Sequence, residues 1–215
     1  MNFITTIQER YTLNTEELLN ELSKRLDLDG DNSKIFSALG MVMLAHSGDI
    51  RRRDDSCLNH ILRVALMAGD LVDNKAEILL LGLLHDVVED YPEYITGTVD
   101  ELWNYLEKEY GKNVTSALDA LTNPPDVEEE EKSGHHTPVL YHKHIEHTLK
   151  NEYASFVKLA DFTDNVMIVN LSDDIKWKAE LNRRYHPVIP LFMERFSTKE
   201  YAHSLKEFFT FIQEK

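Results

Sequence analysis

The sequence is poor in residues that interrupt helices or cross-link chains. Its 215 residues include 8 glycines, 6 prolines and a single cysteine. An all-β sandwich needs many tight turns rich in glycine and proline, so their scarcity favours long helices joined by short connections. Cys57 has no second cysteine with which to form an intramolecular disulfide, and one thiol excludes a thiolate-rich metal centre. These absences predict an all-α protein without covalent cross-links.

Long apolar runs are also missing. The most apolar stretch, residues 78–84, is far shorter than the roughly 20 residues that a membrane-spanning helix requires. The first residues do not combine a basic start, an apolar run and a small-residue cleavage site. The sequence therefore predicts a cytoplasmic protein with no membrane partner, in which residues 78–84 form a buried core helix.

Positive charge is scarce as well. The chain has 23 basic and 38 acidic residues, which gives a formal net charge of −15 at pH 7. A nucleic acid duplex or an anionic membrane surface would be repelled by this charge rather than attracted. An anionic substrate would therefore need a local cation at its binding site.

Most of the chain has hydrophobic residues at helical spacing, with cap residues such as Asn14 and Thr98 at several starts. The pattern predicts helices within residues 14–26, 31–48, 58–68, 76–88, 98–111, 114–121, 141–149, 153–169, 174–185 and 199–212. The acidic stretch 126–134 is the only linker-like segment, and we interpret it as a loop inside one domain. We therefore expect a single domain over residues 1–215, in which helices of 174–215 pack on a core made by about 41–170.

One segment changes abruptly from apolar to titratable. After Leu83 and Leu84 the chain reads His85, Asp86, Val87, Val88, Glu89 and Asp90. On a continuous helix, at about 100° per residue, the four titratable side chains would lie on one side. A histidine and a carboxylate that emerge together from apolar surroundings need hydrogen-bonding partners or a divalent metal to offset their desolvation.

Two further segments have the same character. His60 begins an apolar helix, and Asp161 ends the apolar run 156–160. We therefore predict four metal ligands, two imidazoles and two carboxylates: His60, His85, Asp86 and Asp161. This donor set suits manganese, iron, cobalt or zinc, with open positions left for water and substrate.

The order of these four residues resembles the H…HD…D signature of the HD-domain metal-dependent phosphohydrolases, an all-α superfamily. Residues 85–90 resemble the HDxxED element of one branch, the alarmone hydrolases of the RelA/SpoT-homologue family. Weaker similarities lie at residues 46–53, 111–114, 121–123 and 157–165. The resemblance covers roughly residues 41–170, with no counterpart of that family's synthetase domain. It implies a single HD-type helical bundle that acts as a free-standing hydrolase.

The resemblance also implies an activity and roles for individual residues. The activity is removal of the 3′ pyrophosphate from guanosine tetra- or pentaphosphate, with one divalent ion, Mn²⁺ being favoured over Fe²⁺, Co²⁺, Zn²⁺ and Mg²⁺. A metal-activated water would be the nucleophile, and Glu89 and Asp90 would be the catalytic carboxylates that orient or deprotonate it. Residues expected to contact the nucleotide are cationic, aromatic or polar: Arg51, Arg52, Arg53, His46, Tyr141, Lys143, Lys158 and Asn165.

Two alternatives remain open. The chain has Ile61 and Tyr91 where the family usually has proline and threonine, so another HD-type nucleotidase or a phosphodiesterase would use the same metal chemistry on a different nucleotide. A non-catalytic nucleotide-binding regulatory module is the other alternative, although all four predicted ligands are present. The sequence does not indicate the oligomeric state.

Overall fold

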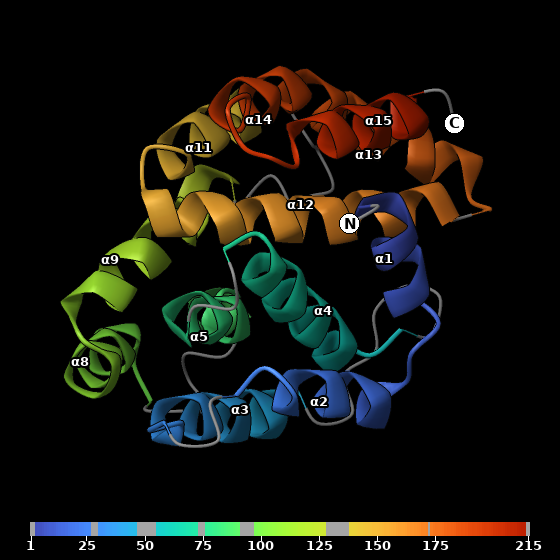
Figure 1. Ribbon diagram of the computed structural model, residues 1–215. Coiled ribbons are helices and arrows are strands. Elements are labelled where there is room, and N and C mark those ends of the chain that lie inside the picture. The colour runs from blue at the N-terminus through green and yellow to red at the C-terminus, as the bar shows by residue number, and fades with distance from the viewer. Residues whose placement is uncertain are drawn as a thin grey trace. The chain divides into compact units, whose positions relative to one another are not determined.

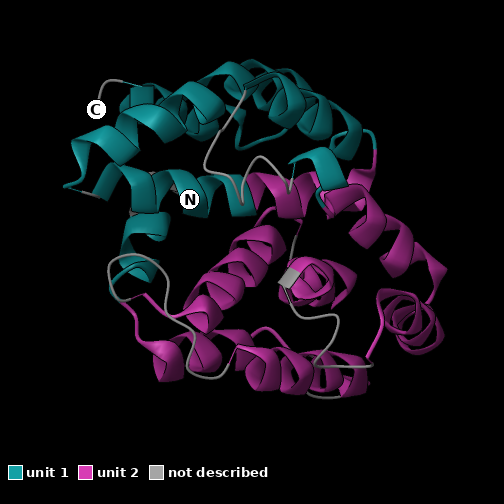
Figure 2. Ribbon diagram, turned by 180° about the vertical axis from the view of Figure 1, so that it is seen from behind, with its two compact units in different colours: residues 1–12, 123–150, 161–215 teal, residues 13–122, 151–160 magenta. Residues whose placement is uncertain are grey.

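The computed structural model describes residues 3–26, 30–46, 55–72, 76–90, 97–127, 138–171 and 173–213. Within these ranges every extended regular element is a helix and no strand is present, which confirms the all-α prediction (Figure 1). No helix in the described ranges combines the length and the apolar character needed to cross a membrane. The chain divides into two compact units, shown in different colours in Figure 2.

Unit 2 comprises residues 13–122 and 151–160. Its helices are α2 (Thr15–Ser23), α3 (Ser33–Ala45), α4 (Cys57–Asp70), α5 (Ala76–Leu84), α6 (Val87–Asp90), α8 (Val99–Tyr110), α9 (Lys112–Leu121) and the first half of α12 (Glu152–Leu171). α5 packs against α3, α4 and α9, and α4 also packs against α2. Every residue from 78 to 84 is buried, as expected for a helix that is apolar on all sides. The predicted core helix is therefore confirmed.

Unit 1 comprises residues 1–12, 123–150 and 161–215. It contains α1 (Phe3–Arg10), α11 (Pro138–Thr148), the second half of α12, α13 (Ile175–Tyr185), the short 3₁₀ helix η2 (His186–Val188), α14 (Ile189–Arg195) and α15 (Ala202–Gln213). Its core is aromatic: the Phe162 ring centroid lies 4.8 Å from that of Phe192 and 6.0 Å from that of Phe209. These contacts join α12, α14 and α15.

The helices differ from the predicted ranges in three places, the first being α1, which has no predicted counterpart. The sequence pattern predicts one helix over 76–88, but α5 ends at Leu84 and α6 begins at Val87. The interpretation that the four titratable residues of 85–90 lie along one continuous helix is therefore wrong. The segment 186–195 was not predicted to be helical. Pro187 and Pro190 lie in the first turns of η2 and α14, where the missing amide hydrogen costs no helical hydrogen bond.

Candidate metal centre

Three of the four predicted ligands meet in unit 2. His60 comes from the first turn of α4, while His85 and Asp86 form the turn between α5 and α6. One possible ligand atom from each residue lies within 4.8 Å of the other two, so the group could hold a metal ion. His60 is 2% exposed and His85 is 4% exposed, whereas the Asp86 side chain is 29% exposed. The group is therefore buried on the imidazole side and accessible from the carboxylate side.

Gly82 explains how α4 and α5 come close enough to form this group. A Cβ atom at Gly82 would lie 2.6 Å from the Cα atom of Ala65, a distance that real Cβ atoms essentially never show. Glycine thus allows the backbones of the two helices to touch at this crossing. His60 lies about one helical turn before Ala65, and His85 lies about one turn after Gly82. The close crossing is what makes the imidazoles neighbours, with ring centroids 5.2 Å apart.

The His85 ring is oriented by its own helix. Its Nδ1 atom lies 2.8 Å from the carbonyl oxygen of Gly82. A carbonyl only accepts hydrogen bonds, so Nδ1 carries a proton and donates it, and Nε2 is the ring atom left for a second proton or a metal ion. This is the arrangement in which metal-binding histidines are usually held. The same hydrogen bond uses a carbonyl of the last turn of α5, which is consistent with the end of the helix at this point.

Asp86 lies between the two imidazoles. Its Oδ1 atom is 3.1 Å from Nε2 of His85, and its Oδ2 atom is 3.5 Å from Nε2 of His60. Burial raises the pKa of Asp86, but the charge of His85 and hydrogen bonds from His60 and His85 outweigh it and hold that pKa well below its usual range. The carboxylate is therefore ionised. Since Nδ1 of His85 already donates to Gly82, the contact between Nε2 and Oδ1 is favourable when a second ring proton or a metal cation lies between these two atoms.

The fourth predicted ligand, Asp161, belongs to unit 1. It lies on α12, is 6% exposed and accepts a hydrogen bond of 2.6 Å from the Nδ2 atom of Asn165, one turn later. Asn165 therefore orients the Asp161 carboxylate. Lys158 lies on the part of α12 that belongs to unit 2 and is 7% exposed. The roles of Asp161 as a metal ligand and of Asn165 and Lys158 in substrate binding stay predictions.

The predicted catalytic carboxylates follow the cluster on α6. Glu89 is partly exposed, and its amide donates to the carbonyl oxygen of Asp86. Asp90 is the last residue of α6, and its side chain lies outside the described part. His46 directly follows α3 and is 2% exposed. The three predicted phosphate-binding arginines, Arg51, Arg52 and Arg53, lie outside the described residues.

Tyr141 and Lys143 on α11 were predicted to contact the substrate together. Tyr141 is buried, with the guanidinium carbon of Arg184 4.1 Å from its ring centroid, whereas Lys143 is exposed. Two residues apart on a helix is a rotation of about 200°, so the two side chains point to different sides of α11. The Tyr141 ring contacts the buried Arg184 and the Tyr185 ring, both within unit 1.

Three residues that shape the site were not predicted from the sequence: Gly82, Arg63 and Asp55. Gly82 carries a weak signal, since a glycine inside an apolar helix indicates a close approach of another backbone. Arg63 carries a stronger one, because an arginine inside the apolar run 61–68 needs a buried partner. That partner is Asp55. Nothing in the sequence alone selects it among 38 acidic residues.

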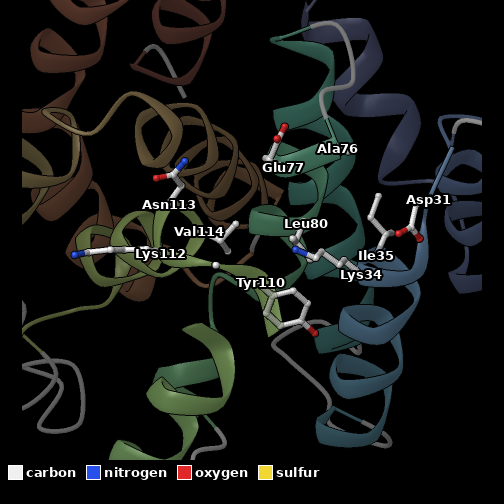
Figure 3. A pocket seen from close by; sticks show the side chains of 11 residues that line it. Asp31, Lys34, Ile35, Ala76, Glu77, Leu80, Tyr110, Lys112, Asn113 and Val114 are labelled. Atoms are coloured by element: carbon white, nitrogen blue, oxygen red, sulfur yellow. The ribbon is translucent and has the colours of Figure 1, made fainter. Parts of the chain in front are cut away.

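Unit 2 also has a cavity of about 370 Å³ bordered by α3, α5 and the start of α9 (Figure 3). Its wall is apolar at Ile35, Leu80 and Val114, and the amine of Lys34 turns towards it while Lys112 points away. Asp31 and Glu77 balance these two lysines in charge. None of the residues predicted to bind metal or substrate lines this cavity.

Comparisons with known proteins add no family to this description. No protein-family model matches the chain, and no curated protein matches it significantly.

Proposed function

We propose that the chain is a metal-dependent phosphohydrolase that acts on a nucleotide. The observation that carries the proposal is the group formed by His60, His85 and Asp86. An ionised carboxylate lies between two buried imidazoles, and one of these rings is fixed so that Nε2 faces the carboxylate. Imidazole and carboxylate donors suit divalent manganese, iron, cobalt or zinc. The resemblance to HD-domain phosphohydrolases supports the same assignment and favours Mn²⁺, with Asp161 as the fourth ligand.

The residues of the chain have separate tasks in this proposal. A bound divalent ion would lower the pKa of a water molecule and polarise a phosphoryl oxygen. His60, His85 and Asp86 would hold the ion, and the exposed side of Asp86 leaves an approach for the substrate. Glu89 and Asp90, which lie on α6 just after Asp86, would orient the attacking water or accept its proton.

The leading substrate is guanosine tetraphosphate, whose hydrolysis would give guanosine diphosphate and pyrophosphate. A bound metal ion would supply positive charge next to the phosphates in a chain whose net charge is −15. Ile61, which replaces the proline usual in the resembling family, is 1% exposed in the core of α4. That difference therefore concerns core packing rather than direct contact with a substrate.

The proposal is tested by product analysis with metal-free and Mn²⁺-loaded protein. Guanosine tetraphosphate is incubated beside a panel of nucleoside mono-, di- and cyclic phosphates. We expect Mn²⁺-dependent release of pyrophosphate, reduced more than about 100-fold in Asp86→Asn and Asp161→Ala, because removing a ligand costs more than the 10–100-fold typical of its supporting partners. Glu77→Gln is the matched control, since Glu77 is an exposed carboxylate on α5 outside the cluster.

Each other result has a defined meaning. If only a different nucleotide is hydrolysed, the proposed phosphohydrolase activity stands and the proposed substrate is wrong. If the chain binds Mn²⁺ but hydrolyses none of the nucleotides, the proposed phosphohydrolase activity is wrong and a nucleotide-binding module is favoured. Turnover unaffected by Asp86→Asn would place the chemistry elsewhere in the chain.

A further inference from the structure

We propose that Arg63 and Asp55 form a positioning pair that holds the metal ligand His60 in place. The inference rests on the proposed metal site, but it concerns residues that do not themselves belong to the ligand group. It starts from the way in which α4 begins.

The first turn of α4 carries His60 but lacks a side-chain cap. Ser56 is the N-cap residue, with an extended backbone and no hydrogen bond from its side chain to the helix. The amide of His60 donates to the carbonyl oxygen of Ser56 at 3.2 Å. The position of His60 therefore depends on where Ser56 is held.

The Arg63–Asp55 pair supplies that restraint. The guanidinium of Arg63 grips the Asp55 carboxylate with two bonds, from Nη1 to Oδ1 at 3.1 Å and from Nη2 to Oδ2 at 2.5 Å. Arg63 is 2% exposed and the Asp55 side chain is 16% exposed, so the guanidinium is shielded from solvent and its two bonds fix both distance and orientation. Asp55 directly precedes Ser56. The pair thus ties the residue before the helix to a point two turns inside it, with His60 between the two.

A second tie acts on the same turn. The hydroxyl of Thr15, the first residue of α2, donates to Oδ1 of Asn59 at 2.7 Å. Asn59 precedes His60. Asp55, just before the first turn, and Asn59, within it, are therefore held by side-chain contacts rather than by a helix cap.

The opposite end of α4 offers a natural comparison. Asp70, the last residue of α4, pairs with Arg25, and both side chains are largely buried. This pair also fastens α4 to a neighbouring segment of unit 2. It lies about ten residues from His60, or roughly 15 Å along the helix at 1.5 Å per residue.

The experiment compares Asp55→Asn with Asp70→Asn. Each variant removes one carboxylate charge from an ion pair of α4, so changes in net charge are matched. Mn²⁺ affinity of the full chain is measured by titration calorimetry, and the absorption spectrum of bound Co²⁺ reports the ligand geometry. We expect Asp55→Asn to weaken Mn²⁺ binding by about 10-fold or more, the loss typical when a residue that supports a metal ligand is mutated. The Co²⁺ spectrum should change as well. Asp70→Asn should change the Mn²⁺ affinity less than about twofold, even if it lowers the thermal stability of the chain as much as Asp55→Asn does.

Arg63→Lys separates geometry from charge. It keeps the positive charge but loses the two-pronged contact, so weaker Mn²⁺ binding in this variant would come from orientation alone. It also provides the test if Asp55→Asn does not fold. Equal affinities for Asp55→Asn and Asp70→Asn, or wild-type affinity and spectrum in Arg63→Lys, would overturn the positioning role. A wild-type chain that binds no Mn²⁺ would instead overturn the proposed metal site, and the positioning role with it.

Discussion

Among single residues, His186 illustrates how burial alone changes an ionisation. It begins η2, and its Nε2 atom is buried without a hydrogen-bond partner among the described residues. Burial lowers the pKa of His186 below its ordinary value of 6.5. The unfolded chain therefore takes up this proton at a higher pH than the folded chain. Stability from the neutral ring is complete above pH 6.5 and is lost as the pH falls towards the folded-state pKa.

We expect His186→Gln to reduce the pH dependence of stability. The free energy of unfolding of the metal-free chain is measured with urea at several pH values between about 8 and about 5, the range in which histidine changes charge. The wild type should lose more stability on acidification than the variant does. His203→Gln is the control, because the His203 side chain is 85% exposed. An unchanged slope in His186→Gln would show that this ring does not contribute.

At the same scale, the residues of the cluster were easier to identify in the sequence than the residues that support them. His60, His85 and Asp86 are visible in the sequence because titratable residues interrupt apolar segments. Their meeting in unit 2 agrees with that local signal. The partnership of Arg63 with Asp55 is different, since it depends on how the chain turns into α4. Sequence spacing contains no information about that turn.

At the scale of secondary-structure elements, the crossing of α4 and α5 controls the candidate site. Gly82→Ala would place a Cβ atom against backbone atoms of Ala65. Backbone atoms inside a helix cannot move aside as the end of a flexible side chain can, so the clash remains. Overpacking of this kind typically costs about 1–3 kcal/mol. We expect a loss of at least that size in the free energy of unfolding, together with weaker Mn²⁺ binding, because the helices that carry His60 and His85 have to separate. Urea unfolding and calorimetric titration measure the two effects.

Gly40 provides the matched control within unit 2. It lies in α3, and a Cβ atom there would meet nothing within 4 Å. Gly40→Ala should therefore stabilise the chain by about 0.5–1 kcal/mol through helix propensity, with Mn²⁺ affinity unchanged. If both alanine variants had the same stability and affinity, the close crossing at Gly82 would have no role in forming the site.

The elements also show where periodicity stops being informative. The apolar run from 76 to 88 has no glycine or proline at its end, so the pattern alone favours one helix. The structure has a turn at His85 and Asp86, where the His85 side chain bonds to the Gly82 carbonyl. A side chain that uses a backbone acceptor is a local competition that hydrophobic spacing does not register. The break nevertheless falls at the residues predicted to have a chemical function.

For the whole molecule, composition was a better guide than periodicity. Few glycines and prolines predicted an all-α chain, and the described residues contain helices without strands. The division into two compact units was not predicted. One unit joins residues 1–12 to 161–215, and such a grouping arises from contacts between segments far apart in the sequence. The pattern of single residues does not encode which distant segments pack together.

The net charge of −15 has a consequence for the chain as a whole. Like charges repel more strongly in a folded chain than in an expanded one, and salt screens that repulsion. Raising NaCl from about 0.01 M to about 0.15 M shortens the screening length from about 30 Å to about 8 Å. We therefore expect the melting temperature to rise with salt, by about 2–4 °C for each 1 kcal/mol gained in a domain of this size. The double variant Glu107→Lys/Glu194→Lys, at two exposed positions near helix ends, should respond less, because it carries less negative charge. A melting temperature that falls with salt would mean that attractive ion pairs, such as Arg63–Asp55 and Arg25–Asp70, outweigh the general repulsion.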